Sequence, residues 1–192
     1  MALDVIVIYG SVRSTRQGIK AAKFVVNTFK KRGHTVTLVD PLETKLPLID
    51  KLYREYEKGK APKVLEDLAG LFRKADAFVI VSGEYNHSIP PALTNLLDHF
   101  RVEYFFRPSG IVCYSVGPFG GVRAAMQLRA LLGELGMSSI PTIFAIPGVH
   151  SSFNEEGIDL KNIYSDSVKR FLDELEWYAN ALKEARNKGI PY

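Results

Sequence analysis

Short apolar runs recur along the chain, separated by longer stretches in which apolar residues return with helical spacing. The short runs are rich in β-branched side chains, which is typical of strands buried on both faces of a sheet. We predict strands at Val5–Tyr9, Thr35–Asp40, Asp76–Val81, Gly110–Val116 and Ile140–Ile146. Pro141 falls early in the last run, which indicates an edge strand or a strand that begins there.

The longer stretches predict helices. After the first strand, Ile19, Ala22, Val25, Val26 and Phe29 recur on one helical face. Similar patterns predict helices near residues 64–72, 92–100, 124–135 and 165–186. Strands that alternate with helices in this way predict an α/β fold built on a parallel, doubly wound sheet of five strands.

Composition and charge narrow the class of protein. The chain has 192 residues, 46% of them hydrophobic and 24% charged, which suits one globular domain over residues 1–192. The net charge of +4 is spread along the chain, and no recognition motif accompanies it, so nucleic acid is not expected as a partner. A single cysteine, no leader-like start and no apolar run of membrane-spanning length predict a cytoplasmic protein without a membrane partner. That cysteine, Cys113, lies in a predicted buried strand, where a thiol fills space.

The turn between the first strand and the first helix carries the most informative chemistry. It reads Gly10-Ser11-Val12-Arg13-Ser14-Thr15-Arg16-Gln17-Gly18. Free amides at a helix N-terminus attract an anion, and hydroxyls and arginines add donors that suit a phosphate. The turn lacks both the Gly-Lys-Ser/Thr ending of an ATPase P-loop and the three-glycine dinucleotide fingerprint. An ordinary glycine turn with surface arginines is the alternative.

Two further loops are expected beside this turn, because ligands of doubly wound sheets bind beyond the carboxyl ends of the strands. The loop after the third strand contains Glu84-Tyr85-Asn86-His87, and the loop after the fourth runs from Ser115 to Arg123. The loop after the fourth strand is rich in glycine, which allows a ligand to approach the backbone closely.

Three separated motifs resemble the NADPH-dependent FMN reductases, a family of flavodoxin-like flavoproteins. Gly10–Arg13 matches the family's Gly-Ser-x-Arg phosphate loop, and Gly83–Asn86 together with the helix Pro90–Asp98 matches its flavin loop and the following helix. The stretch Gly117–Gly121 lies where the family closes over the flavin ring. Two positions depart from the family pattern: Arg16 stands where a small hydroxyl residue is usual, and Gly83 where proline is usual.

The resemblance implies a flavodoxin-like three-layer α/β/α fold that binds FMN. It implies an enzyme that passes a hydride from NADPH or NADH to bound FMN, and then to a flavin, quinone, azo or similar small-molecule acceptor by a ping-pong mechanism. It also implies a homodimer or homotetramer. The rival hypothesis is a flavodoxin-like electron carrier that does not oxidise NAD(P)H, although a sequence pI of about 9.1 does not fit the usual acidic docking surface.

The resemblance and the residue types together give the expected cofactor-binding set, which we place in three groups. These are Ser11, Arg13, Arg16, Gln17 and Gly18 at the phosphate; Glu84, Tyr85, Asn86 and His87 along the ring; and Ser115, Gly117, Gly120 and Gly121 at its pyrimidine side.

Several of these residues also have ordinary explanations. Asn86 is a favoured turn former, and Tyr85 could anchor its loop. Glu84 could pair with an arginine without contacting a ligand. His87 could act as a general acid, but the flavin carries the chemistry and no catalytic side chain is required. No metal site is expected, because the histidines lack ligand spacing. The charged stretch Lys51–Lys60 is either a surface excursion or a lid.

Overall fold

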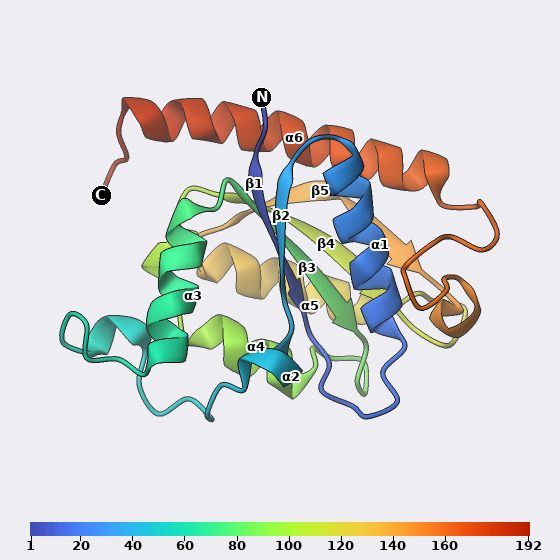
Figure 1. Ribbon diagram of the computed structural model, residues 1–192, viewed down its shortest axis with the longest axis horizontal. Coiled ribbons are helices and arrows are strands. Elements are labelled where there is room, and N and C mark those ends of the chain that lie inside the picture. Colours follow the sequence, from blue (N-terminus) through green and yellow to red (C-terminus); the bar gives the residue numbers. More distant parts are fainter.

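The computed structural model describes residues 1–192 as five strands alternating with six α-helices (Figure 1). The strands are β1 (Asp4–Tyr9), β2 (Thr35–Val39), β3 (Ala77–Gly83), β4 (Pro108–Tyr114) and β5 (Ser138–Ile146). The helices are α1 (Gly18–Lys31), α2 (Pro41–Thr44), α3 (Lys63–Lys74), α4 (Pro91–Asp98), α5 (Val122–Glu134) and α6 (Ser165–Lys188).

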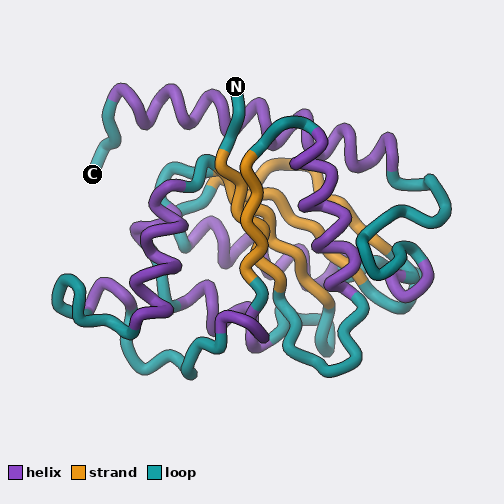
Figure 2. Tube along the Cα trace, in the orientation of Figure 1, coloured by secondary structure: helices purple, strands orange, loops and turns teal.

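All five strands form one parallel sheet in the order β2-β1-β3-β4-β5. Helices α1 and α6 lie on one face of this sheet, and α3, α4 and α5 lie on the other (Figures 1 and 2). The predicted three-layer, doubly wound fold is therefore confirmed. Because the chain turns from β2 back across β1 to β3, the strand order reverses between β1 and β3, which is where such folds bind ligands.

Alternate residues of the central strands enter two separate apolar layers. Val5 and Val7 of β1 pack with α1 and α6, whereas Ile6 and Ile8 pack with α3, α4 and α5. Burying each large apolar side chain contributes about 1.5–3 kcal/mol. This two-sided burial explains why the strands read as continuous apolar runs.

The structure adds one helix to the prediction and adjusts several boundaries. Helix α2 begins after Asp40, whose carboxylate accepts a hydrogen bond from the Leu42 amide at 3.0 Å, and Pro41 occupies the first helical position. Strand β5 lies at the sheet edge and includes Pro141. Of the two expectations for this proline, the edge strand is therefore the correct one.

Residues 45–62 make an irregular excursion between α2 and α3. Its 3₁₀ turn, Tyr53–Glu55, is anchored at two points: the Tyr53 amide donates to the His99 carbonyl at 2.8 Å, and the Tyr53 hydroxyl donates to Glu66 at 2.7 Å. The stretch Lys51–Lys60 is thereby held beside α3 and the end of α4. None of the six helices combines the length and the apolar character that crossing a bilayer needs.

Candidate functional site

The loop between β1 and α1, residues 10–17, forms one wall of the candidate site. The Gly10 amide donates to the Val81 carbonyl of β3 at 3.0 Å, which fixes the start of the loop. At its end, Gln17 precedes α1 without offering a side-chain cap to the helix. The first amides of α1 therefore have no side-chain acceptor, and together with the helix dipole they favour an anion.

Ser11 and Arg13 lie on this wall in different environments. Ser11 is almost fully buried, and its hydroxyl lies 2.7 Å from the hydroxyl of Tyr85. Arg13 is exposed, and its guanidinium carbon lies 5.9 Å from the centre of the Tyr85 ring. Tyr85 thus connects the loop after β3 to the loop after β1.

Arg16 has a buried acidic partner. Its guanidinium holds the Asp40 carboxylate through two hydrogen bonds, one of them 2.6 Å long, and also donates to the Ser11 carbonyl at 3.2 Å. The side chains of Arg16 and Asp40 are only 15% and 10% exposed. Hydrogen bonding to Asp40 raises the pKa of Arg16 above its ordinary value. The pair ties the loop to the end of β2.

The loop after β3 is a tight reverse turn over residues 85–88. Tyr85 and Ser88 exchange two backbone hydrogen bonds of 3.0 and 2.9 Å. The central residues Asn86 and His87 have φ values of 51° and 62°, the left-handed conformation that a type I′ turn requires. Both are exposed. Helix α5 supports the turn, since Gln127 donates to the His87 carbonyl at 2.9 Å.

Glu84 joins this turn to the start of α5. Its carboxylate accepts hydrogen bonds from the backbone amides of Arg123 at 3.0 Å and Ala124 at 3.4 Å, and from the Arg123 guanidinium at 3.3 Å. A carboxylate at the first amides of a helix stabilises the helix N-terminus. Glu84 therefore does pair with an arginine, as one alternative predicted. It also caps α5, which the sequence did not reveal.

The glycines after β4 serve the backbone of their own loop. Gly120 and Gly121 have φ values of 62° and 79°, and a Cβ at Gly121 would lie 2.7 Å from the Tyr114 carbonyl oxygen. Gly117 is exposed, and a Cβ there would meet nothing within 4 Å. Ser115 donates to the Gly117 carbonyl at 2.9 Å.

These three loops surround a cavity of about 320 Å³ at the carboxyl ends of β1, β3 and β4. It is lined by Ser11, Arg13, Thr15, Arg16, Gln17, Gly83, Glu84, Tyr85, Tyr114, Ser115, Val116 and Val149. Of the expected cofactor residues, the structure does not place Gly18, Asn86, His87, Gly117, Gly120 and Gly121 in this lining. Tyr114 and Val149 were missed by sequence reasoning; a polar aromatic at the end of an aliphatic strand was the signal for Tyr114.

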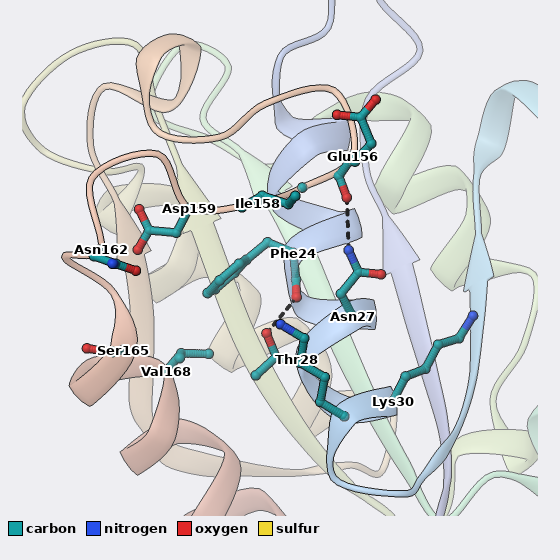
Figure 3. Close-up of a pocket in the computed structure, with 12 residues that line it drawn as sticks. Phe24, Asn27, Thr28, Lys30, Glu156, Ile158, Asp159, Asn162, Ser165 and Val168 are labelled. Carbon is teal, nitrogen blue, oxygen red and sulfur yellow. Dashed lines mark hydrogen bonds between the residues drawn. The ribbon is translucent and has the colours of Figure 1, made fainter.

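A larger, open cavity of about 800 Å³ lies between α1 and the segment that leads into α6 (Figure 3). Phe24 of α1 lies near its centre, and Asn27 donates to the Glu156 carbonyl at 2.8 Å. It is lined by α1 and by residues that precede or begin α6, not by the loops at the carboxyl ends of β1, β3 and β4. We therefore take the smaller cavity as the candidate site.

The sequence pattern of the family described as NADPH-dependent FMN reductase matches residues 3–151, from β1 to the turn after β5. This chain belongs to the NADPH-dependent FMN reductase family. Membership confirms the sequence prediction of an oxidoreductase that uses FMN and NAD(P)H.

Individual relatives agree with this assignment. An NADPH azoreductase of Bacillus sp. (strain OY1-2) is 27% identical over 187 residues, covering 97% of this chain and 98% of the relative. An NAD(P)H-dependent FMN reductase of Schizosaccharomyces pombe is 37% identical over 153 residues, covering 74% and 72%. The fold resembles that of FerB, a flavoenzyme NAD(P)H:(acceptor) oxidoreductase from Paracoccus denitrificans, with a TM-score of 0.72 and 18% identity over 95% of this chain and 98% of FerB.

Gly83, where the family motif led us to expect proline, has a local explanation. Gly83 is the last residue of β3 and pairs with Tyr114 of β4. A Cβ on Gly83 would lie 3.1 Å from both Cζ and the hydroxyl oxygen of Tyr114. The small residue therefore leaves room for the large aromatic ring beside it.

Cys113 takes no part in the site of this FMN reductase family member. The side chain is fully buried among the core residues that face α3, α4 and α5. Burial raises the pKa of the Cys113 thiol to about 12. A thiol that stays protonated is a poor nucleophile, which supports its interpretation as a core residue.

Proposed function

We propose that this protein oxidises NADPH or NADH and reduces a small-molecule acceptor in two half-reactions at the 320 Å³ cavity, with FMN bound there. The observation that carries the proposal is the convergence of an uncapped α1 N-terminus, the Ser11 hydroxyl and the Arg13 guanidinium on the cavity at which the sheet order reverses. The family assignment supports the same cofactor.

The FMN phosphate is the natural occupant of the α1 end of the cavity. Ser11, Arg13 and Gln17 line it, and the α1 amides add donors that match a dianionic group. Arg16 contributes positive charge from one side while its hydrogen bonds to Asp40 and to the Ser11 carbonyl shape the loop. Gly18 lets α1 begin close to the ring of Tyr114.

The isoalloxazine ring suits the part of the cavity that Glu84 and Ser115 line, with Tyr85 between this part and Ser11. We place the exposed 85–88 turn, with Asn86 and His87, near a polar edge of the ring. Gly120 and Gly121 shape the loop after β4 beside it, since a side chain at either would meet backbone of β4 or β5. Glu84 holds the loop after β3 against the loop after β4 through its hydrogen bonds to the first amides of α5.

When bound, FMN supplies the hydride acceptor and donor atom of the reaction. The task of this chain would be to hold the flavin and to let the two substrates stack in turn against its ring. Val116, an exposed apolar residue of the cavity lining, suits a flat acceptor such as a quinone, an azo compound or a second flavin. The Bacillus azoreductase supports this acceptor class.

A homodimer or homotetramer remains part of the proposal. The aromatic residues that follow α4 pack within the chain, since Tyr104 is fully buried and Phe105 contacts Gly136 and Tyr192. The better candidate surface is Leu48, 85% exposed in a segment that Asn95 of α4 holds through the Pro47 carbonyl and the Ile49 amide. A cytoplasmic location likewise stays a prediction.

One experiment separates the proposal from its rivals. The purified protein is titrated with FMN, the visible spectrum is recorded, and NADPH or, in a parallel sample, NADH is then added without oxygen. Rapid bleaching of the bound flavin is the expected result. Flavin binding without bleaching by NADPH or NADH would favour an electron carrier reduced by a partner protein, and the absence of flavin binding would refute both hypotheses.

A further inference from the structure

Arg16 lines two neighbouring cavities. One is the candidate site of about 320 Å³, and the other is a cavity of about 610 Å³ between α1 and the segment that joins β2 to α2. Asp40, which follows β2 directly, lines only the second cavity. An anion in the candidate site could therefore contact Arg16, whereas Asp40 could act on that anion only through its charge.

Asp40 is held firmly beside Arg16. Both of its carboxylate oxygens accept hydrogen bonds from the guanidinium, and one of them also accepts from the Leu42 amide at 3.0 Å. The Asp40 carbonyl accepts from the Thr44 amide at 2.9 Å and from the Thr44 hydroxyl at 2.8 Å. On the arginine side, the guanidinium carbon lies 5.3 Å from the centre of the buried Tyr9 ring. The two charges therefore stay together.

The charges that line the candidate site are few. Arg13, Arg16 and Glu84 are its only lining residues with a formal charge. Glu84 pairs with Arg123, and the charge of Arg16 faces that of Asp40. Because the side chains of Arg16 and Asp40 are mostly buried, salt screens their charges less than those of an exposed pair. Arg13 forms no ion pair, so its charge alone is not offset.

We propose that Asp40 offsets the charge of Arg16 and thereby lowers the affinity of the cavity for FMN, leaving Arg13 as the one uncompensated arginine for the flavin phosphate. FMN carries a dianionic phosphate and riboflavin carries none, so Asp40 acts on FMN and not on riboflavin. A weaker hold on a ligand changes chiefly its dissociation rate, so Asp40 favours the exchange of FMN with free flavin. This inference rests on the proposed function, since it assumes that the cavity binds FMN.

The test removes the charge of Asp40 and keeps its shape. In Asp40→Asn the side-chain oxygen still accepts from the Leu42 amide, and dissociation constants of FMN and riboflavin are measured by quenching of flavin fluorescence at low ionic strength. We expect affinity for FMN to rise about three- to tenfold, with a smaller gain as salt is added, and affinity for riboflavin to change less than about twofold. The control is Glu43→Gln, which removes an exposed acidic charge of α2 that forms no ion pair with Arg16. Both constants are expected to stay within about twofold in this control.

A series of charge changes tests the offset directly. Arg16→Gln leaves the charge of Asp40 alone and is expected to weaken FMN about tenfold or more. Adding Asp40→Asn to this variant makes the pair neutral again and is expected to bring FMN affinity back to within about threefold of the unaltered protein. In each variant, riboflavin binding reports on the shape of the rest of the cavity.

A direct bond from Arg16 to the phosphate gives a different pattern. The double variant would then bind FMN as weakly as Arg16→Gln does, and Asp40→Asn would leave FMN affinity unchanged or lower it. Either result would overturn the inference, as would equal changes for FMN and riboflavin in Asp40→Asn. If the unaltered protein binds neither flavin, the proposed function itself fails, so the two failures are distinguishable.

Discussion

The carboxylate of Glu84 lies 3.0 Å from the backbone nitrogen of Arg123, so an acid on the loop after β3 caps a helix that follows β4. The two residues are 39 positions apart in sequence. This contact couples two of the three loops that surround the cavity, and it gives Glu84 a role in folding as well as in the site.

Replacing Glu84 with Ala is expected to lower the free energy of unfolding by about 1–2 kcal/mol, because the first amides of α5 lose their acceptor. Glu84→Gln is expected to lose less, because the amide oxygen still accepts. Urea denaturation measures both. The control is Glu134→Ala, which removes a largely exposed carboxylate from the other end of α5, paired with Arg101. A loss of stability no greater than in this control would contradict the capping role.

Replacing Arg13 with Ala is expected to weaken FMN about tenfold or more and riboflavin much less, since only FMN carries a phosphate for the guanidinium to bind. Isothermal titration or fluorescence quenching with both flavins provides the comparison. Arg170→Ala, on the exposed surface of α6, controls for the loss of one positive charge. Equal weakening of the two flavins by Arg13→Ala would exclude a phosphate contact.

Arg16 and Asp40 are expected to depend on each other. Their side chains are mostly buried and joined by two hydrogen bonds, so removing either leaves the other without its partner. A double-mutant cycle with Arg16→Ala and Asp40→Ala is expected to give a coupling free energy of about 1–3 kcal/mol in denaturation experiments. Additive losses would show that the pair contributes little to the stability of the loop.

Gly18 and Gly117 are expected to respond differently to the same change. Gly18→Ala would force a methyl group into the Tyr114 ring, whereas Gly117→Ala would place one in open space. We expect Gly18→Ala to cost about 1–3 kcal/mol of stability through overpacking, and Gly117→Ala to change it by less than about 0.5 kcal/mol. Thermal unfolding followed by circular dichroism measures both, and similar melting temperatures for the two variants would contradict this prediction.

Cys113 is expected to resist thiol reagents in the folded protein. Its side chain is buried and its pKa is about 12, so at pH 8 the reactive thiolate is scarce as well as inaccessible. Iodoacetamide should label the protein only after denaturant is added, as mass spectrometry can show. Fast labelling of the native protein at pH 8 would indicate that this part of the core opens.

The sheet and its helices were predictable because the central strands β1, β3 and β4 are buried on both faces and apolar residues recur at helical spacing in the long helices. Helix α2 was missed although Asp40-Pro41 is a start signal, because the segment is too short to show periodicity. The bond from Glu84 to α5 could not be foreseen, since nothing local links it to Arg123. Tyr114 had a local signal as a polar aromatic at a strand end, but the space for its ring exists only where Gly18 and Gly83 meet in the fold.

The turn at residues 85–88 is fastened to α5 twice, at its base through Glu84 and at its tip through Gln127. A ligand that pushes on this turn must therefore displace the first turns of α5 as well. This side of the cavity is preorganised: its conformational entropy is lost when the chain folds rather than when a flavin binds. Differences in flavin affinity among variants should then arise mainly from the opposite wall, residues 10–17, where we propose that the phosphate binds.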